Sequence, residues 1–290
     1  MQTRRDFLRA LGISAVGATA LSRVTWAEVV RKKPLPLGIQ LYTLRALMEK
    51  DFQGTLAQVA AIGYKEVEFA GYYKRTGAEV RGILAKLGLR SPSSHIGLPS
   101  SPSSTDTAAS DDAWVKLLPD AKTIGNQWAV VPWLDAKLRQ TPEDWARFAE
   151  RLNKLGNAAK KEGLKLAYHN HDFELATNGD GTWLDFLVQH TDPALVSFEM
   201  DVYWVTKGGG DPIAFLTKYP HRFSMLHLKD ATAAPERNMV DVGSGTIDWK
   251  AVLMKARAQG ATHAFVEHDK PTDALASARA SHDYLARLKY

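Results

Sequence analysis

The chain contains no cysteine among its 290 residues. This absence excludes disulfide bonds, a thiol nucleophile and thiolate metal ligands. Any metal ion that the protein binds must therefore be held by nitrogen and oxygen atoms. Such a donor set suits one divalent ion of the group Mn²⁺, Co²⁺, Mg²⁺ and Zn²⁺.

A hydrophobic run long enough to cross a bilayer is also missing near the N-terminus. An apolar, charge-free stretch covers residues 10–21, which is too short for a permanent transmembrane helix. It follows residues 3–9 (TRRDFLR), a pattern typical of twin-arginine export signals. We therefore predict a signal peptide over residues 1–27, a periplasmic location and no stable membrane anchor. The alternative is a disordered basic N-terminus.

The chain has little excess charge once this segment is set aside. Its formal net charge is +5, and residues 1–27 hold four arginines and one aspartate, so the remainder carries +2. No basic stripe remains to bind a phosphate backbone, and we expect no nucleic-acid partner. A small-molecule partner fits better, and a homo-oligomer remains open.

Strand-like and helix-like segments alternate from residue 34 to the C-terminus. Eight apolar runs are expected to be strands, at Leu37–Leu41, Lys65–Phe69, Leu89–His95, Gln127–Trp133, Lys165–Asn170, Val196–Asp201, Phe223–Lys229 and His263–His268. Eight helices are expected between and after them, at Asp51–Ile62, Gly77–Leu87, Asp111–Ile124, Thr141–Glu162, Thr182–His190, Asp211–Tyr219, Asp248–Gln259 and Thr272–Leu288. No hairpin is evident, so the pattern predicts parallel βαβ units.

Eight such units in this length predict a single α/β domain, a (β/α)₈ TIM barrel over residues 34–290. The alternative is an open, doubly wound sheet. No G-x-G-x-x-G motif follows the first expected strand to support it.

Acids and histidines stand at the C-terminal ends of the expected strands. Asp201, His227 and Glu267 each lie at or within two residues of the end of one of the last three strands. In a TIM barrel the strand ends form the active-site face, and a buried charge is costly unless it is paired or bound to a metal. We therefore expect these three side chains to bind one metal ion. The alternative is that they only form ion pairs.

A fourth ligand is expected just after the strand Lys165–Asn170. Glu174 completes a set of two glutamates, one aspartate and one histidine, and His169 is the competing choice. Other polar and aromatic side chains near the strand ends are candidates for catalysis or substrate binding. The candidate catalytic residues are His169, His171 and Lys229, and the candidate substrate-binding residues are Glu68, His95, Trp133, Tyr203 and Trp204.

Several motifs resemble the sugar phosphate isomerase/epimerase family of the xylose isomerase-like TIM barrel superfamily. They are IQLYTLR (39–45), VEFAGY (67–72), YHNHDFEL (168–175), MDVYW (200–204), LHLKD (226–230) and DVGSGTIDW (241–249). The resemblance implies a divalent metal held by acids and a histidine, at positions that Asp201, His227 and Glu267 occupy. Many relatives place a glutamate directly at the end of strand five, where this chain has Tyr168 and His169.

The resemblance also implies proton abstraction next to a carbonyl of a sugar or keto-sugar, with the metal stabilising the enediolate. We expect an isomerase or epimerase, with His169 as the base, His171 helping to bind substrate and Lys229 stabilising the enolate oxygen. A lyase or hydratase acting on 3-keto-glycosides or keto-polyols is the alternative. A non-catalytic carbohydrate-binding barrel is a third possibility, and a DNA-repair endonuclease of the same superfamily is disfavoured by the charge.

Overall fold

The computed structural model describes residues 34–101, 103 and 105–290. The expected signal peptide at residues 1–27 lies outside the described residues. Residues 34–290 form one compact unit. Of the helices in this unit, none is both long and apolar enough to cross a membrane.

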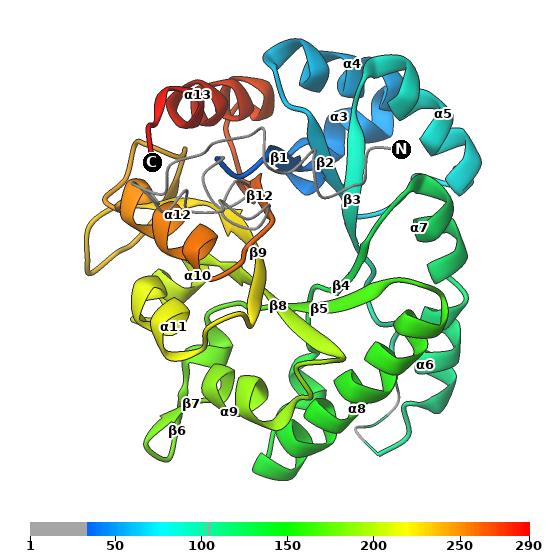
Figure 1. Ribbon diagram of the computed structural model, residues 1–290, viewed down its shortest axis with the longest axis vertical. Coiled ribbons are helices and arrows are strands. Elements are labelled where there is room, and N and C mark those ends of the chain that lie inside the picture. The colour runs from blue at the N-terminus through cyan, green and yellow to red at the C-terminus, as the bar shows by residue number, and fades with distance from the viewer. Residues whose placement is uncertain (1–33, 102, 104) are drawn as a thin grey trace, which may run out of the picture. The chain divides into compact units, whose positions relative to one another are not determined.

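Eight parallel strands close into a barrel (Figure 1). They are β1 (Leu37–Gln40), β2 (Glu66–Phe69), β3 (Arg90–His95), β4 (Trp128–Val131), β5 (Lys165–His169), β8 (Val196–Asp201), β9 (Phe223–Leu228) and β12 (His263–Val266). Strand β1 pairs with β12 on one side and with β2 on the other, so the sheet has no open edge. The predicted TIM barrel is confirmed, and the doubly wound alternative is wrong.

Helices surround the barrel and follow its strands in the chain (Figure 1). The α-helices are α3 (Arg45–Lys50), α4 (Phe52–Ile62), α5 (Gly77–Leu87), α6 (Ala108–Val115), α7 (Leu118–Ile124), α8 (Pro142–Lys161), α9 (Trp183–His190), α10 (Val202–Lys207), α11 (Pro212–Lys218), α12 (Trp249–Ala258) and α13 (Ala274–Arg287). The described part of the chain also contains three short 3₁₀ helices, η1 (Leu41–Leu44), η2 (Ala136–Leu138) and η3 (Phe173–Leu175).

Side-chain caps explain why the predicted helices begin where they do. The Asp51 carboxylate accepts a hydrogen bond from the Gly54 amide at the start of α4. Thr141 and Asp144 form a capping box at the start of α8. Each cap satisfies amide groups that have no partner inside the helix.

Several local features differ from the prediction, and α3 and α10 are helices that were not expected. The helix expected at Asp111–Ile124 is two helices, because the ring of Pro119 would clash with the carbonyl of Val115 in a continuous helix; α6 ends at Val115 and α7 begins at Leu118. Two short antiparallel pairs were also not expected. They join β6 (Thr177–Asn178) to β7 (Gly181–Thr182) and β10 (Asp230–Ala231) to β11 (Met239–Val240). Two-residue strands are too short to show a period of two.

One layer of the barrel interior consists of apolar side chains. Trp128, Val130, Ala167, Met225 and Phe265 are buried together in one cluster. A larger apolar core lies between the strands and the surrounding helices. This cluster forms an apolar layer across the barrel. The polar side chains lie next to it, closer to the C-terminal ends of the strands.

Candidate functional site

Several polar side chains point into the barrel, because they occupy alternate positions along their strands. On β8, Glu199 and Asp201 occupy alternate positions, and they pair in register with Met225 and His227 of β9. Residue His227 in turn pairs with Phe265 of β12. Because successive side chains of a strand point to opposite faces, these residues share the inner face of the barrel. The site is therefore a polar layer of the barrel interior, directly next to the apolar layer.

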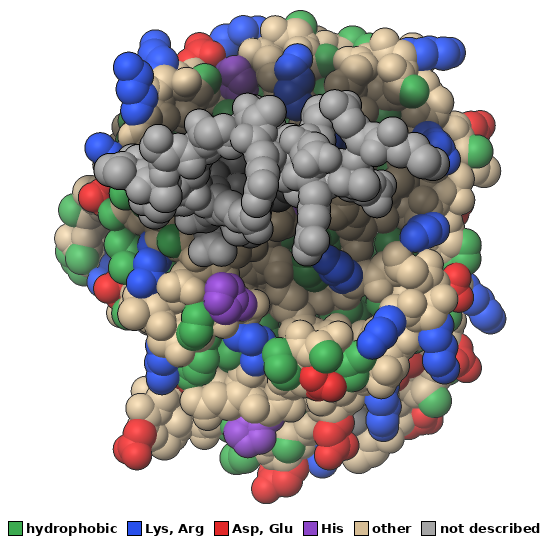
Figure 2. Space-filling model, in the orientation of Figure 1, with side chains coloured by type: hydrophobic (Ala, Val, Ile, Leu, Met, Phe, Trp, Pro, Cys, Tyr) green, Lys and Arg blue, Asp and Glu red, His purple; other side chains and the backbone are tan. Residues whose placement is uncertain are grey.

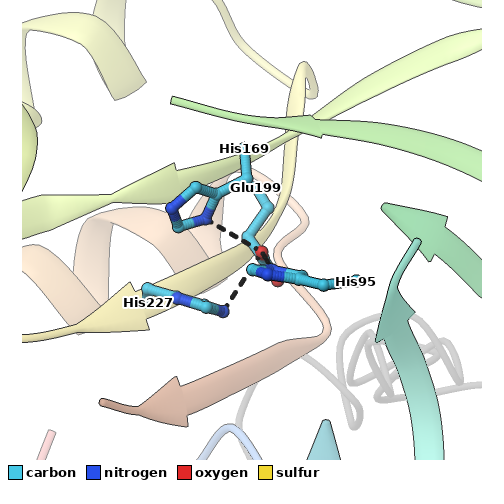
Figure 3. Close-up of side chains that lie close together, drawn as sticks. All are labelled: His95, His169, Glu199 and His227. Carbon is cyan, nitrogen blue, oxygen red and sulfur yellow. Dashed lines mark hydrogen bonds and ion pairs between the residues drawn. The ribbon is translucent and has the colours of Figure 1, made fainter. Parts of the chain in front are cut away.

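Three histidine rings converge on one carboxylate oxygen in this layer. Glu199 Oε2 lies 2.7 Å from His95 Nε2, 3.1 Å from His169 Nδ1 and 3.1 Å from His227 Nε2 (Figure 3). The second oxygen, Glu199 Oε1, is buried and has no hydrogen-bond partner. Glu199 is fully buried. The sequence places Glu199 inside the barrel, but the meeting of three histidines at its carboxylate depends on the closed sheet.

A second buried carboxylate, Glu68, contacts two of these histidines, His95 and His227. Its Oε2 is 2.7 Å from His227 Nε2 and accepts a hydrogen bond of 2.9 Å from Gln40 Nε2. Its Oε1 accepts a hydrogen bond from the hydroxyl of Ser93. Glu68 is one of the predicted substrate-binding residues, whereas in the structure it is fully buried and hydrogen-bonded to its neighbours.

A lysine and three acids form the outer part of the layer. Lys229 Nζ lies 3.0 Å from Asp201 Oδ2, 2.7 Å from Glu267 Oε2 and 2.8 Å from Asp269 Oδ1. Glu267 Oε2 is also 2.8 Å from His227 Nδ1. Three of the four predicted metal ligands, Asp201, His227 and Glu267, thus lie close together. Asp269 was not predicted, although its position two residues after Glu267 was the available signal.

Burial and charge shift the pKa values of these groups in different directions. Burial by itself lowers the pKa of Lys229, but the carboxylates of Asp201, Glu267 and Asp269 outweigh it and raise the pKa well above its usual value. Burial raises the pKa of Asp201 to about 6 despite the Lys229 ammonium. Burial, followed by the nearby His227 ring, lowers the pKa of His169 to about 3. The His169 ring is therefore neutral at pH 7 and carries a lone pair.

The structure does not bring Glu174 into this site. Its carboxylate accepts hydrogen bonds from the Tyr168 hydroxyl and, at 2.8 Å, from the His171 amide. Tyr168 packs against Phe148 and Phe198, so it belongs to the outward face of β5. The chain leaves β5 after His169 and η3 turns Glu174 towards that outward face. Glu174 and His169 are the two candidates for the fourth metal ligand, at or just after β5. Of these, His169 is the one that lies beside the other candidate ligands.

The buried Glu174 predicts a pH dependence of stability. Burial raises the pKa of Glu174 to about 7, so its protonated form stabilises the folded state. This contribution is complete below the unfolded pKa of about 4.5 and is lost as the pH rises through about 7. We expect the free energy of unfolding of Glu174→Gln to lack this decrease, which amounts to roughly 3 kcal/mol. Urea unfolding between pH 4.5 and 8 measures it. The exposed Glu143→Gln on α8 is the control, and equal slopes in wild type and Glu174→Gln would contradict the prediction.

A cavity of about 510 Å³ opens above the polar layer. Its walls contain most of the side chains predicted from the sequence, namely His95, His169, His171, Lys229, Glu267, Trp133 and Trp204. Tyr203 is instead buried, and its hydroxyl donates to the Arg237 carbonyl oxygen at 3.0 Å. Trp133 is 48% exposed. Its ring packs against the His171 ring in a T-shaped arrangement, with a centroid distance of 4.6 Å. The cavity is therefore lined by aromatic side chains and, on the side of the polar layer, by charged side chains.

The chain is similar to several characterised proteins. It is 39% identical over 100 residues to inosose dehydratase from Clostridium tetani, a match that covers 34% of this chain and 33% of that protein. The chain thus matches about a third of the length of such relatives. A sugar phosphate isomerase/epimerase from Parabacteroides distasonis superposes with a TM-score of 0.76 and 27% identity, over 93% of this chain and 98% of that one.

The fold is shared more widely than the sequence. The IolI protein, crystallised with a zinc atom, superposes with a TM-score of 0.71 over 87% of this chain and 97% of that one, and its identity of 15% supports a shared fold alone. The model of the xylose isomerase-like TIM barrel family matches residues 56–288, which is more than half of the chain. The chain therefore belongs to the xylose isomerase-like TIM barrel family.

Proposed function

We propose that this protein is an enzyme that removes a proton next to the carbonyl group of an unphosphorylated sugar or keto-polyol, with the help of one divalent metal ion. The observation that carries this proposal is the cavity, which places the Lys229 ammonium, the His171 ring and two tryptophans around one space. The reaction needs a cation beside the developing oxyanion and a base beside the carbon, and both kinds of group line this cavity.

The charges in the layer support a bound divalent cation. Glu68, Glu199, Asp201 and Glu267 are all buried, and Lys229 lies against only two of these four acids. A buried carboxylate without a cation is costly, and Glu199 Oε1 has no hydrogen-bond partner at all. Two groups of side chains that share His227 could hold the ion, one of three histidines with Glu199 and one of Asp201, His227 and Glu267.

Nitrogen and oxygen donors of this kind suit Zn²⁺, Mn²⁺ or Co²⁺. A bound ion of this charge supplies a Lewis acid that polarises the carbonyl group of the substrate. The side chains of the cavity perform the remaining tasks. Lys229 supplies a positive charge near the substrate oxygen on which negative charge develops.

We assign the base to His171 and not to His169. The two nitrogens of the His169 ring face the carboxylates of Glu199 and Asp201, at 3.1 and 3.6 Å. The Nδ1 atom of His171 has no hydrogen-bond partner. Burial lowers the pKa of His171 well below its usual value of 6.5, so the ring is neutral at pH 7 and can accept a proton.

The charges of the cavity favour an unphosphorylated substrate. Among the described residues that line it, Lys229 is the one Lys or Arg side chain, and three carboxylates already surround its ammonium group. A phosphate group needs unpaired Arg or Lys side chains or a cluster of backbone amides. The exposed Trp133 ring and the nearby Trp204 ring offer apolar surfaces for the carbon face of a sugar. On the face seen in Figure 2, Lys and Arg side chains are interspersed with Asp and Glu, which fits the expectation of no nucleic-acid partner.

The carbanion formed by proton removal leads either to an isomer or epimer, or to loss of a neighbouring hydroxyl group. The similarity to a sugar phosphate isomerase/epimerase over nearly the whole chain supports the first outcome. The local match to inosose dehydratase supports dehydration of a keto-polyol as a second candidate. Both begin with the same proton transfer.

NMR in deuterated water tests the proposal. The full chain, loaded with Zn²⁺, Mn²⁺ or Co²⁺, is incubated with ketohexoses, inososes and 3-keto-glycosides, and each is compared with a phosphorylated ketose. We expect deuterium to enter the carbon next to the carbonyl of at least one unphosphorylated compound. A new sugar signal identifies isomerisation or epimerisation, and a conjugated enone identifies dehydration. Turnover of only the phosphorylated ketose overturns the substrate class, and binding without exchange supports a carbohydrate-binding barrel.

We also propose that the protein is exported through the twin-arginine pathway, on the evidence of Arg4 and Arg5 in the N-terminal pattern. We expect replacement of both by lysine to retain the protein in the cytoplasm, because the pathway reads the arginine pair. Cell fractionation and immunoblotting measure the distribution. Replacement of Arg23 by lysine, outside the pair, is the matched control. Full recovery of the double variant from the periplasm would refute the proposal.

A further inference from the structure

We propose that Tyr42 and Trp133 form a second ring-binding subsite in the cavity, and that the substrate is a glycoside whose second ring lies there. The second ring is a sugar or an aryl group, since both present an apolar face. This inference rests on the proposed function, which places the reacting ring beside Lys229 and His171. It adds a substrate class, because a free ketose or keto-polyol has a single ring.

The strands divide the lining of the cavity into a charged half and an uncharged half. Among the described lining residues, the Asp, Glu and Lys side chains all follow β5, β9 or β12, namely Asp172, Lys229, Glu267 and Asp269. The lining residues that follow β1, β2, β3 and β4 are all uncharged, namely Tyr42, Ala70, Gly97, Pro132 and Trp133. These four strands are consecutive in the closed sheet. The reaction therefore belongs to the charged half, and these five residues define an uncharged half beside it.

Two exposed aromatic rings belong to the uncharged half. Tyr42 is 42% exposed, and Trp133 is similarly exposed. Only two other large apolar side chains among the described residues, Leu117 and Met254, are comparably exposed, and neither lines the cavity. Tyr42 follows β1 and Trp133 follows β4, with β2 and β3 between them in the sheet. Aromatic faces at a cavity stack on aryl rings and on the apolar face of a sugar, so the two rings suit a cyclic group.

Contacts with its neighbours fix the position of Tyr42. The Arg45 guanidinium lies over one face of the ring, with its carbon 4.1 Å from the ring centroid. Arg45 Nη1 donates to the Tyr42 carbonyl oxygen at 2.8 Å, and Nη2 donates to the Asp269 carbonyl oxygen at 2.9 Å. The Tyr42 amide donates to Gln40 Oε1 at 3.1 Å. A ring that is fixed before the ligand arrives loses little conformational entropy on binding. Tyr42 is therefore a preorganised stacking surface, and Arg45 ties it to the charged half.

The uncharged half has room for a second ring. Apart from its chain neighbours, a Cβ atom added at Gly97 would meet no heavy atom within 4 Å, and Ala70 is exposed. These two small residues follow β2 and β3, the strands that separate Tyr42 from Trp133. The cavity volume of about 510 Å³ lies within the range of about 300–1,000 Å³ that is typical of sites for drug-sized ligands. Such ligands are larger than a single sugar ring.

Binding of unreactive glycosides to the full chain tests the subsite without turnover. Ligand-observed NMR titrations compare methyl β-D-glucoside, which has a single ring, with cellobiose and phenyl β-D-glucoside, whose second rings are a sugar and an aryl group. We expect at least one of the two-ring compounds to bind about 10-fold more tightly than methyl β-D-glucoside, because its second ring covers apolar surface. The compound that gains affinity identifies the second ring as a sugar or an aryl group.

Two variants assign this gain in affinity to the uncharged half. Tyr42→Ala removes one stacking surface, and Gly97→Leu fills the open space, at a position where the glycine does not have a positive φ. We expect each variant to lower the affinity for the two-ring compound to that for methyl β-D-glucoside. Leu117→Ala removes an exposed apolar side chain outside the cavity and should keep the full preference. Circular dichroism checks the folding of all three variants.

The wild-type protein alone can overturn the inference, by binding all three compounds equally or by binding none of them. An unchanged two-ring preference in either folded variant of the uncharged half would also overturn it. These results are distinct from failure of the proposed reaction. A two-ring preference in a protein that exchanges no substrate proton would leave the subsite standing and refute the reaction alone. Proton exchange with a ketohexose, without a two-ring preference, would keep the reaction and refute the subsite.

Discussion

Replacing Lys229 with methionine is expected to lower turnover more than about 1,000-fold and to destabilise the fold by about 3–5 kcal/mol. The ammonium group is buried and contacts three carboxylates. Methionine fills the same space but leaves Asp201 and Glu267 buried without their cation. The loss of turnover has a separate cause, because the substrate oxygen loses the positive charge near it. Denaturant unfolding and the NMR exchange assay measure the two effects.

Controls separate these two effects of Lys229. The exposed Lys250→Met on α12 should change stability by less than about 0.5 kcal/mol and leave turnover intact. The double variant Lys229→Met with Asp201→Asn removes one of the orphaned charges, and it should recover part of the lost stability without recovering turnover. A single Lys229→Met variant that unfolds at the wild-type urea concentration and turns over normally would show that the ammonium group has neither role.

Most helices could be predicted from the sequence, because capping residues and glycines mark where a helix begins and ends. Asp51 and Thr141 cap helices at the positions where short polar side chains precede amphipathic segments. Gly88 ends α5 in the left-handed conformation that glycine adopts without strain. The break between α6 and α7 was missed, although Pro119 was a visible signal.

The site was harder to predict because it depends on which strands become neighbours. Asp201, His227 and Glu267 were found from their positions at strand ends, and they do lie together. Glu174 was chosen by counting ligand types, and nothing in the sequence shows that Tyr168 draws its carboxylate to the outward face of β5. Glu199 lies two residues before Asp201, and this spacing alone does not distinguish an ion-pair partner from a ligand. Only the closed barrel shows that histidines from β3, β5 and β9 meet at its carboxylate.

Replacement of His171 by asparagine is expected to reduce hydrogen–deuterium exchange at the substrate's α-carbon by about 100- to 10,000-fold, the usual contribution of a general base. The ring lines the cavity between Trp133 and Trp204, and the asparagine amide has no nitrogen lone pair that can accept the proton. The bound metal should be unaffected, because His171 belongs to neither group of possible ligands. The exposed His190→Asn on α9 should exchange at the wild-type rate.

The neighbouring histidine distinguishes a base from a ligand. Because His169 belongs to one of the two possible ligand groups, loss of both Co²⁺ and exchange in His169→Asn would identify it as a ligand. His171→Asn should keep Co²⁺ and lose only exchange. The reverse pattern, with exchange at the wild-type rate in metal-loaded His171→Asn and none in metal-loaded His169→Asn, would return the role of base to His169. The two rings lie 4.9 Å apart between their centroids. Proximity to the substrate alone therefore cannot assign their roles, whereas the contacts of His169 with Glu199 and Asp201 and the unpartnered nitrogen of His171 predict different outcomes for the two variants.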